Sequence, residues 1–173
     1  VKYGDKFLNQ ISVTNGDGPF KYQDEKGKFL YSNNMEIYPI KGLILKLYTD
    51  YSPKSDTSSV AKDRSAVSAF IGFKHQEFRL GAEYNVVKNY GYRKNSDYFG
   101  FSGFGSYSIT DRIDFIMRYD YINHSAPLKL EKAHLLIGGI HYQPVKNLNC
   151  SATVRLLSSS ERLSFYFNVG VKF

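Results

Sequence analysis

The chain ends in the segment Leu163-Ser164-Phe165-Tyr166-Phe167-Asn168-Val169-Gly170-Val171-Lys172-Phe173, where large apolar residues alternate with mostly small or polar ones. Side chains of a β-strand point to opposite faces with a period of two. The segment is therefore expected to form a strand with one apolar wall. That wall would carry Leu163, Phe165, Phe167, Val169, Val171 and Phe173.

The composition favours β structure in a single domain. The 173 residues suffice for one domain. No segment approaches the ~18 consecutive apolar residues of a transmembrane helix, and the mean hydropathy of −0.38 also argues against a helical membrane protein. The 15 Tyr and 13 Phe residues favour strands and membrane interfaces.

The formal charge of +7 does not indicate nucleic-acid binding, because the Lys and Arg residues are scattered and no nucleic-acid-binding motif is present. Cys150 is the single cysteine, so no internal disulfide can form, and it is expected to be a small apolar wall residue. His75, His134 and His141 lack the spacing of a metal site. No glycine-rich phosphate loop occurs, so no cofactor is expected.

Period-two alternation predicts about ten strands, most of them roughly 9 to 12 residues long. Strands of soluble proteins are typically about 5 to 6 residues long, whereas a tilted strand needs about 9 to 11 residues to cross a bilayer. Strand length therefore favours a membrane protein. The predicted strands are 6–15, 29–38, 43–52, 65–74, 78–88, 97–109, 113–123, 133–143, 148–157 and 162–173.

Short and long connections alternate along the chain. The short turns are 39–42, 74–77, 110–112 and 144–147, and the longer polar connections are 16–28, 53–64, 88–96 and 124–132. Transmembrane barrels have this layout, with the short turns on the periplasmic side. We expect an all-β fold, an antiparallel up-and-down transmembrane β-barrel, with about ten strands in one domain over residues 1–173. If the spacing of the short turns is continued toward the N-terminus, it reaches Tyr3-Gly4-Asp5-Lys6. This segment is expected to be another short turn, so a further strand is expected before residue 1.

A soluble sheet with one wet face would show the same alternation, so the aromatic residues decide between the two readings. On the predicted apolar wall they gather near both ends of the strands, as in the two aromatic girdles of a membrane barrel. A soluble β-barrel or sandwich is the alternative. The girdle at the short turns would contain Phe73, Phe78, Tyr107, Tyr142 and Phe173, and the girdle at the long loops Tyr31, Tyr51, Tyr84, Phe99, Tyr121 and Phe165.

The opposite wall is expected to face the lumen, and it carries acidic and basic residues in equal number. Arg79 and Glu83, like Asp114 and Arg118, are four residues apart on one face, and such charges could pair across the wall. Alternatively, the Lys and Arg residues could favour anionic or polar solutes. The candidates are Lys46, Arg79, Glu83, Asp114, Arg118, Asp120, Arg155 and Lys172, together with Glu36 and Asp50.

Catalysis is not expected, although two weak constellations exist. Asp97, Asp120 and His124 could meet near the long loops, and Asn123-His124-Ser125 could form a nucleophilic set. Neither has a defining spacing, and surface loops commonly carry such residues.

The terminal aromatic strand resembles the closing strand of bacterial outer-membrane barrels. In those barrels the assembly machinery recognises the closing strand. Ile11-Ser12-Val13-Thr14-Asn15-Gly16-Asp17-Gly18, Glu36-Ile37-Tyr38-Pro39-Ile40-Lys41-Gly42-Leu43 and Leu80-Gly81-Ala82-Glu83-Tyr84 resemble segments of porins related to the phosphate-selective family. Their Asn-Gly-rich strand exit, Pro-x-x-Gly-Leu turn and Gly-Ala-Glu-Tyr strand carry the similarity. Phe165, Phe167, Val169, Val171 and Phe173 would then form the assembly signal.

This resemblance implies a porin-like channel in the bacterial outer membrane for passive diffusion of small polar or anionic solutes. Its partners would be outer-membrane lipids, the barrel-assembly machinery and those solutes, with a possible homo-oligomer and no nucleic acid. Family members have about sixteen to eighteen strands, so the chain resembles their C-terminal part. Two alternatives are a small closed barrel that binds partners through loops 16–28 and 53–64, and an outer-membrane hydrolase.

Overall fold

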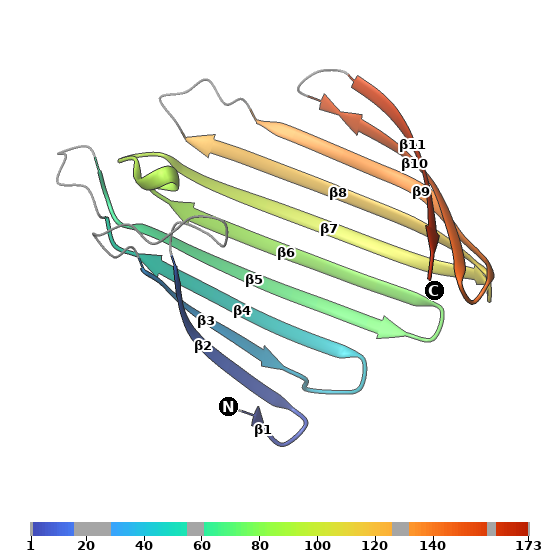
Figure 1. The fold of residues 1–173 in the computed structure, drawn as a ribbon, viewed down its shortest axis with the longest axis horizontal. Helices are drawn as coiled ribbons and strands as arrows, with labels where there is room; N and C mark the ends of the chain where they lie inside the picture. The colour runs from blue at the N-terminus through green and yellow to red at the C-terminus, as the bar shows by residue number, and fades with distance from the viewer. Residues whose placement is uncertain (1, 16–28, 55–60, 126–131, 159–161, 173) are drawn as a thin grey trace.

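The computed structural model describes residues 2–15, 29–54, 61–125, 132–158 and 162–172. The described strands form one antiparallel sheet in which each strand pairs with the next along the chain (Figure 1). A two-residue strand, β1 (Lys2–Tyr3), precedes ten strands of at least nine residues, and a short 3-10 helix, η1 (Tyr90–Tyr92), follows β6. The ten strands are β2 (Phe7–Asn15), β3 (Phe29–Ile37), β4 (Leu43–Ser52), β5 (Arg64–His75), β6 (Phe78–Lys88), β7 (Asp97–Thr110), β8 (Ile113–Ser125), β9 (Ala133–Val145), β10 (Leu148–Leu157) and β11 (Arg162–Val171).

The all-β prediction and the antiparallel up-and-down order are confirmed. The ten long strands coincide with the ten predicted segments within two residues at each end. Pro144 was predicted to lie in a turn but belongs to β9, where a register shift opposite Leu148 and Cys150 marks a bulge. A bulge tolerates proline because the ladder is already interrupted there. The predicted turn near Gly4 is also present, since Tyr3 pairs with Phe7 across it.

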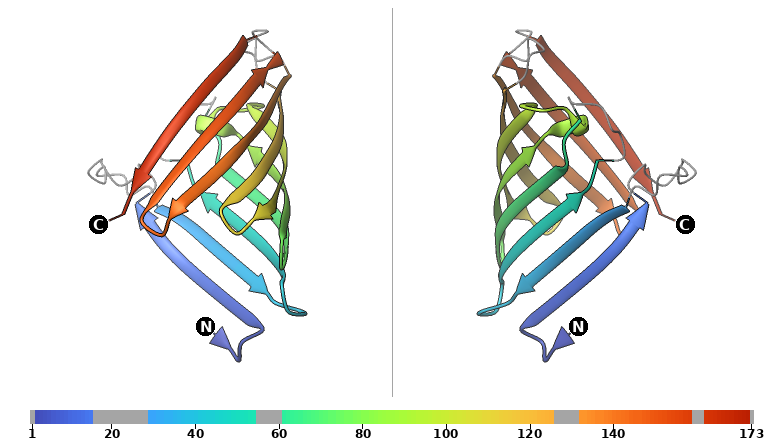
Figure 2. Two further views of the ribbon diagram at one scale, coloured as in Figure 1. Left: turned by 90° about the vertical axis from the view of Figure 1, so that its right-hand side faces the viewer. Right: turned by 90° about the vertical axis from the view of Figure 1, so that its left-hand side faces the viewer.

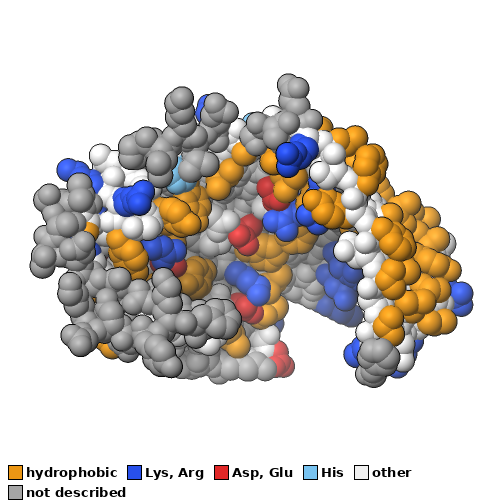
Figure 3. Space-filling model, turned by 45° about the horizontal axis from the view of Figure 1, so that its top comes forward, with side chains coloured by type: hydrophobic (Ala, Val, Ile, Leu, Met, Phe, Trp, Pro, Cys, Tyr) orange, Lys and Arg blue, Asp and Glu red, His pale blue; other side chains and the backbone are white. Residues whose placement is uncertain are grey.

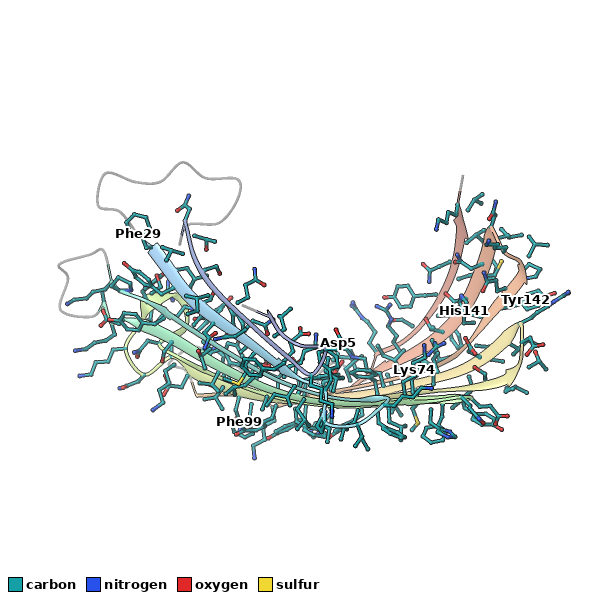
Figure 4. The ribbon with its side chains drawn as sticks, turned by 90° about the horizontal axis from the view of Figure 1, so that it is seen from below. Asp5, Phe29, Lys74, Phe99, His141 and Tyr142 are labelled. Carbon is teal, nitrogen blue, oxygen red and sulfur yellow. The ribbon has the colours of Figure 1, made fainter. Side chains whose placement is uncertain are left out.

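The sheet is curved and open. Its strand order runs from β1 to β11 without a pairing between the two ends. Figure 2 shows the tilted strands of the curved sheet, and Figure 4 shows the sheet as a trough with a concave and a convex side. No helix in the described ranges is long and apolar enough to cross a membrane.

The convex side of the sheet is apolar, and no other part of the described chain forms a second layer over it. In Figure 4, Phe99 lies on this side and Lys74 on the concave side. Ile11, Phe165 and Phe167 are 76%, 74% and 71% exposed. Soluble domains bury an apolar sheet face against another layer, and monomers rarely expose apolar patches beyond a few hundred Å². Among the described residues only seven are buried, namely Asp50, Ser52, Ala61, Ala66, Gly72, Val87 and Ser96.

Candidate functional site

The concave face is the polar face and the candidate site. Residues paired across an antiparallel ladder lie on the same face, so the register traces transverse rows of side chains along it. One row runs from Lys46 through Phe70, Glu83 and Ser102 to Asp120. In Figure 3 basic and acidic side chains gather in the hollow, and apolar side chains cover the outer flank.

The register places the predicted lumen residues of β4 to β10 on this face. Arg79 pairs with Ser106, and Asp114 pairs with Ser108 and His141. Arg118 and Arg155 both pair with Ile137, one from each side. Lys172 follows β11, two residues beyond Gly170, and is exposed. On the opposite, convex face β11 carries Phe165, Phe167, Val169 and Val171. Phe173 lies outside the described residues.

Most carboxylates of the concave face have a basic partner. Lys46 Nζ lies 2.7 Å from Glu36, Arg64 Nη1 lies 2.6 Å from Asp50, and Arg118 Nε lies 2.9 Å from Asp120. The remaining two carboxylates have weaker partners. His141 Nδ1 lies 3.7 Å from Asp114, and Glu83 accepts a 2.7 Å hydrogen bond from the Asn85 amide.

The pairs four residues apart, Arg79 with Glu83 and Asp114 with Arg118, are not among these interactions. Such residues are about 13 Å apart along a strand, since each residue advances by about 3.3 Å. Neighbours across the ladder or two residues away are nearer. Arg118 therefore binds Asp120, and Asp114 accepts a 2.6 Å hydrogen bond from the Ser108 hydroxyl.

Uncompensated positive charge lies on β10 and β11. The described residues of β9 to β11 include no Asp or Glu. The Arg155 guanidinium lies over the Tyr166 ring, 4.1 Å from the centroid, and its Nε is buried without a hydrogen-bond partner in the described structure. Thr153 Oγ1, two residues away on the same face, is also buried without a hydrogen-bond partner in the described structure. Among the described residues, no carboxylate therefore neutralises the charge of Arg155.

A hollow of about 550 Å³ lies on the concave face toward the long loops. Its lining includes both residues of the Asp50–Arg64 pair, both residues of the Arg118–Asp120 pair, and Glu83. Ser102 also donates a hydrogen bond to Asp120 there. Tyr48 and Tyr98 add aromatic surface. The size and the mixture of donors and acceptors suit a small polar molecule.

The β6–β7 connection packs against the β4–β5 connection at this end. The Tyr92 hydroxyl lies 2.9 Å from Ser52 Oγ, and Asn89 Nδ2 donates a 2.8 Å hydrogen bond to the Asp63 carbonyl. The Lys54 amide and the Tyr51 hydroxyl both donate to the Asp63 carboxylate, which lowers its pKa. Sequence analysis predicted only a polar loop here, and the clustered Asn and Gly residues were the one local signal of its left-handed backbone positions.

Some concave residues were missed because the predicted faces or boundaries did not include them. Arg64 was assigned to a loop because β5 was predicted to begin one residue later. Phe70 and Phe104 project from the polar face and stack with ring centroids 6.1 Å apart. The neighbouring Gly81 leaves the space that the Phe104 ring occupies. Such contacts depend on the register between strands, which local sequence does not specify.

The two weak catalytic constellations are not assembled in the described chain. Asp120 is bound by Arg118 and Ser102, whereas the His124 ring stacks on Tyr98 with centroids 5.9 Å apart. Asp97 Oδ1 accepts a 2.9 Å hydrogen bond from the backbone N–H of Asn89. Asn123 and His124 lie on opposite faces by strand alternation. The described residues also contain no group of three or more His, Cys, Asp or Glu side chains that could hold a metal ion.

Comparison of the chain with protein-family models and with curated proteins finds no match.

Proposed function

We propose that this chain forms part of the wall of a β-barrel in the bacterial outer membrane, and that the barrel is a porin-like channel for passive diffusion of small polar or anionic solutes. One observation carries the proposal. A single curved layer has an uncovered apolar convex side and a charged concave side. A membrane barrel needs this division between a lipid-facing and a water-facing wall.

Closure of the barrel is part of the proposal. Open sheet edges do not occur in the hydrocarbon region of a bilayer, because their backbone N–H and C=O groups would lack partners. Part of the β2 edge that β11 would need is already paired with β1, since Lys2 pairs with Leu8 and Tyr3 with Phe7. This pairing favours a larger barrel, with further strands between β11 and β1. It agrees with the resemblance to the C-terminal part of porins related to the phosphate-selective family.

A small closed barrel with a structural or surface-binding role is the second candidate. It is favoured by the apolar side chains that share the concave face, including Phe70, Phe104 and Ile137. Barrels of about eight to ten strands are filled by such side chains, whereas open aqueous pores appear near sixteen strands.

Conductance in planar bilayers distinguishes the two candidates. The full-length protein, purified from outer membranes, is expected to form stable channels with a modest preference for anions. Heat-modifiable migration on gels serves as the control for a folded barrel. A folded barrel without conductance would contradict the channel and favour the filled barrel. A protein that stays soluble and shows no heat-modifiable form would contradict the membrane proposal itself.

A further inference from the structure

The hollow on the concave face has one more negative than positive group in its described lining, which includes three carboxylates and two guanidinium groups. Both guanidinium groups are already engaged. Arg64 Nη1 lies 2.6 Å from Asp50, and Arg118 Nε donates 2.9 Å hydrogen bonds to both carboxylate oxygens of Asp120. Glu83 is the third carboxylate, and no basic side chain of the described chain forms an ion pair with it.

Glu83 has one hydrogen-bond partner. Asn85 Nδ2 donates a 2.7 Å hydrogen bond to Glu83 Oε1, and no other described side chain hydrogen-bonds to this carboxylate. Across the ladder Glu83 has Phe70 on one side and Ser102 on the other, so its neighbours in the row bring no positive charge. Its second oxygen can accept a hydrogen bond from a ligand. A ligand that displaces water from a half-buried carboxylate must replace that hydration, and a cation does so best.

The rest of the hollow is suited to an apolar body. Val87, Ile122 and Leu157 are among its lining residues, and Tyr48 and Tyr98 add two aromatic rings. Small-molecule sites are commonly built this way, with a mainly apolar lining and a few polar groups that fix the orientation of the ligand. Aromatic rings also attract organic cations through their π faces.

We propose that this hollow binds a small organic cation, with an ammonium group at Glu83 and an apolar body against the remaining lining. The assignment rests on the proposed function, since the lumen of a channel brings solutes to this face. An anion is a poorer ligand here because Asp50 and Asp120 already hold the two arginines. Arg155 contributes no charge to the lining, since its guanidinium lies over Tyr166. The site would retain cations locally in a channel whose overall preference is for anions.

Calorimetric titration of the full-length protein in detergent tests the assignment with three probes. Phenethylamine, 2-phenylethanol and 3-phenylpropionate share a phenyl ring on a short chain and are cationic, neutral and anionic at neutral pH. At low ionic strength phenethylamine is expected to bind about tenfold more tightly than either of the others, because only its ammonium group can bind the Glu83 carboxylate. Added salt should weaken the binding of phenethylamine and leave that of the alcohol unchanged.

A matched pair of variants separates Glu83 from the general charge of the concave face. Glu83→Gln keeps the size of the side chain and an acceptor for Asn85, and it should lower the affinity for phenethylamine about tenfold, to that of the alcohol. Asp114→Asn also removes one carboxylate from the concave face, but Asp114 does not line the hollow, so binding should not change. Partition of the probes into detergent micelles is the same for all three proteins and cancels in the comparison.

The three probes decide the matter on the wild-type protein even if a variant does not fold. Equal affinities for phenethylamine and the alcohol overturn the assignment, and so does tightest binding of 3-phenylpropionate. Equal losses in Glu83→Gln and Asp114→Asn would show a general electrostatic effect and overturn it as well. A folded protein that conducts but binds no phenethylamine retains the proposed function and loses the site. A folded protein that does not conduct, yet binds phenethylamine through Glu83, loses the channel and retains the site.

Discussion

Arg155 and Tyr166 form a cation–π pair on the concave face, with the guanidinium carbon 4.1 Å from the ring centroid. The two residues lie on neighbouring strands, and no carboxylate among the described residues neutralises this arginine. Arg118, which is separated from Arg155 in the same transverse row by Ile137, is held by Asp120 instead. The two arginines thus have the same formal charge and different local compensation.

This difference predicts unequal effects on ion selectivity. In the proposed channel, Arg155→Gln should reduce the preference for anions clearly more than Arg118→Gln, because Asp120 already offsets the charge of Arg118. The triple variant with Arg79→Gln, Arg118→Gln and Arg155→Gln should lose most of the preference. Reversal potentials under a salt gradient measure the effect. Equal shifts for the two single variants would contradict the difference in local compensation between Arg155 and Arg118.

The two faces of β10 should tolerate charge differently. Val154 lies on the convex wall and Ser151 on the concave wall. If the convex wall faces lipid, Val154→Arg near the middle of the bilayer should destabilise the protein by about 2 to 4 kcal/mol. Ser151→Arg should cost clearly less. Denaturant unfolding of protein refolded in lipid vesicles provides both values, and the reverse order would mean that the faces are inverted.

Adjacent glycines of β9 provide a matched pair for packing. A Cβ on Gly139 would collide with the carbonyl oxygen of Ala152, whereas a Cβ on Gly138 would meet no atom within 4 Å. Gly139→Ala should therefore destabilise the protein by about 1 to 3 kcal/mol, the usual cost of overpacking. Gly138→Ala should be neutral or slightly stabilising, because it lowers the entropy of the unfolded chain. Unfolding midpoints of the two variants test the difference.

Asp63 should make the contacts at the long loops sensitive to acid. Its folded-state pKa is lowered from the ordinary value of 3.8, first by the hydrogen bond from the Lys54 amide and then by that from the Tyr51 hydroxyl. The stabilisation is therefore fully present above about pH 4 and is lost as the pH falls through the folded-state pKa. The Lys54 amide should lose protection from hydrogen exchange in that range. Asp63→Asn should remove this pH dependence, whereas Asp111→Asn at the opposite end should retain it.

The terminal residue should matter for assembly more than for stability. Deletion of Phe173 is expected to lower the heat-modifiable, membrane-inserted fraction in cells, because the terminal aromatic strand resembles an insertion signal. Deletion should change the unfolding of already inserted protein much less. Normal insertion at normal expression would count against the outer-membrane proposal.

Strand positions could be predicted because the alternation of apolar and polar side chains is a local property of each segment. It predicted the bounds of β4, β6 and β10 to the residue, and it separated Val154 from Arg155. Turn residues such as those around Gly42 also act locally, since Gly42 adopts a φ of 88° that favours glycine. The local signal was wrong at Pro144, which was predicted to lie in a turn and instead lies at a bulge inside β9.

Interactions between strands were decided only by the tertiary structure. Asp50 binds Arg64 and Phe70 stacks on Phe104 because the register and the curvature of the sheet bring distant segments together. The packing of Tyr92 on Ser52 likewise joins two loops that are separate in sequence. Period two determines which face a side chain occupies but carries no information about its neighbour on the next strand. The sequence alone therefore determined the strands and their two faces, whereas the register decided the ion pairs and left Arg155 without a carboxylate partner among the described residues.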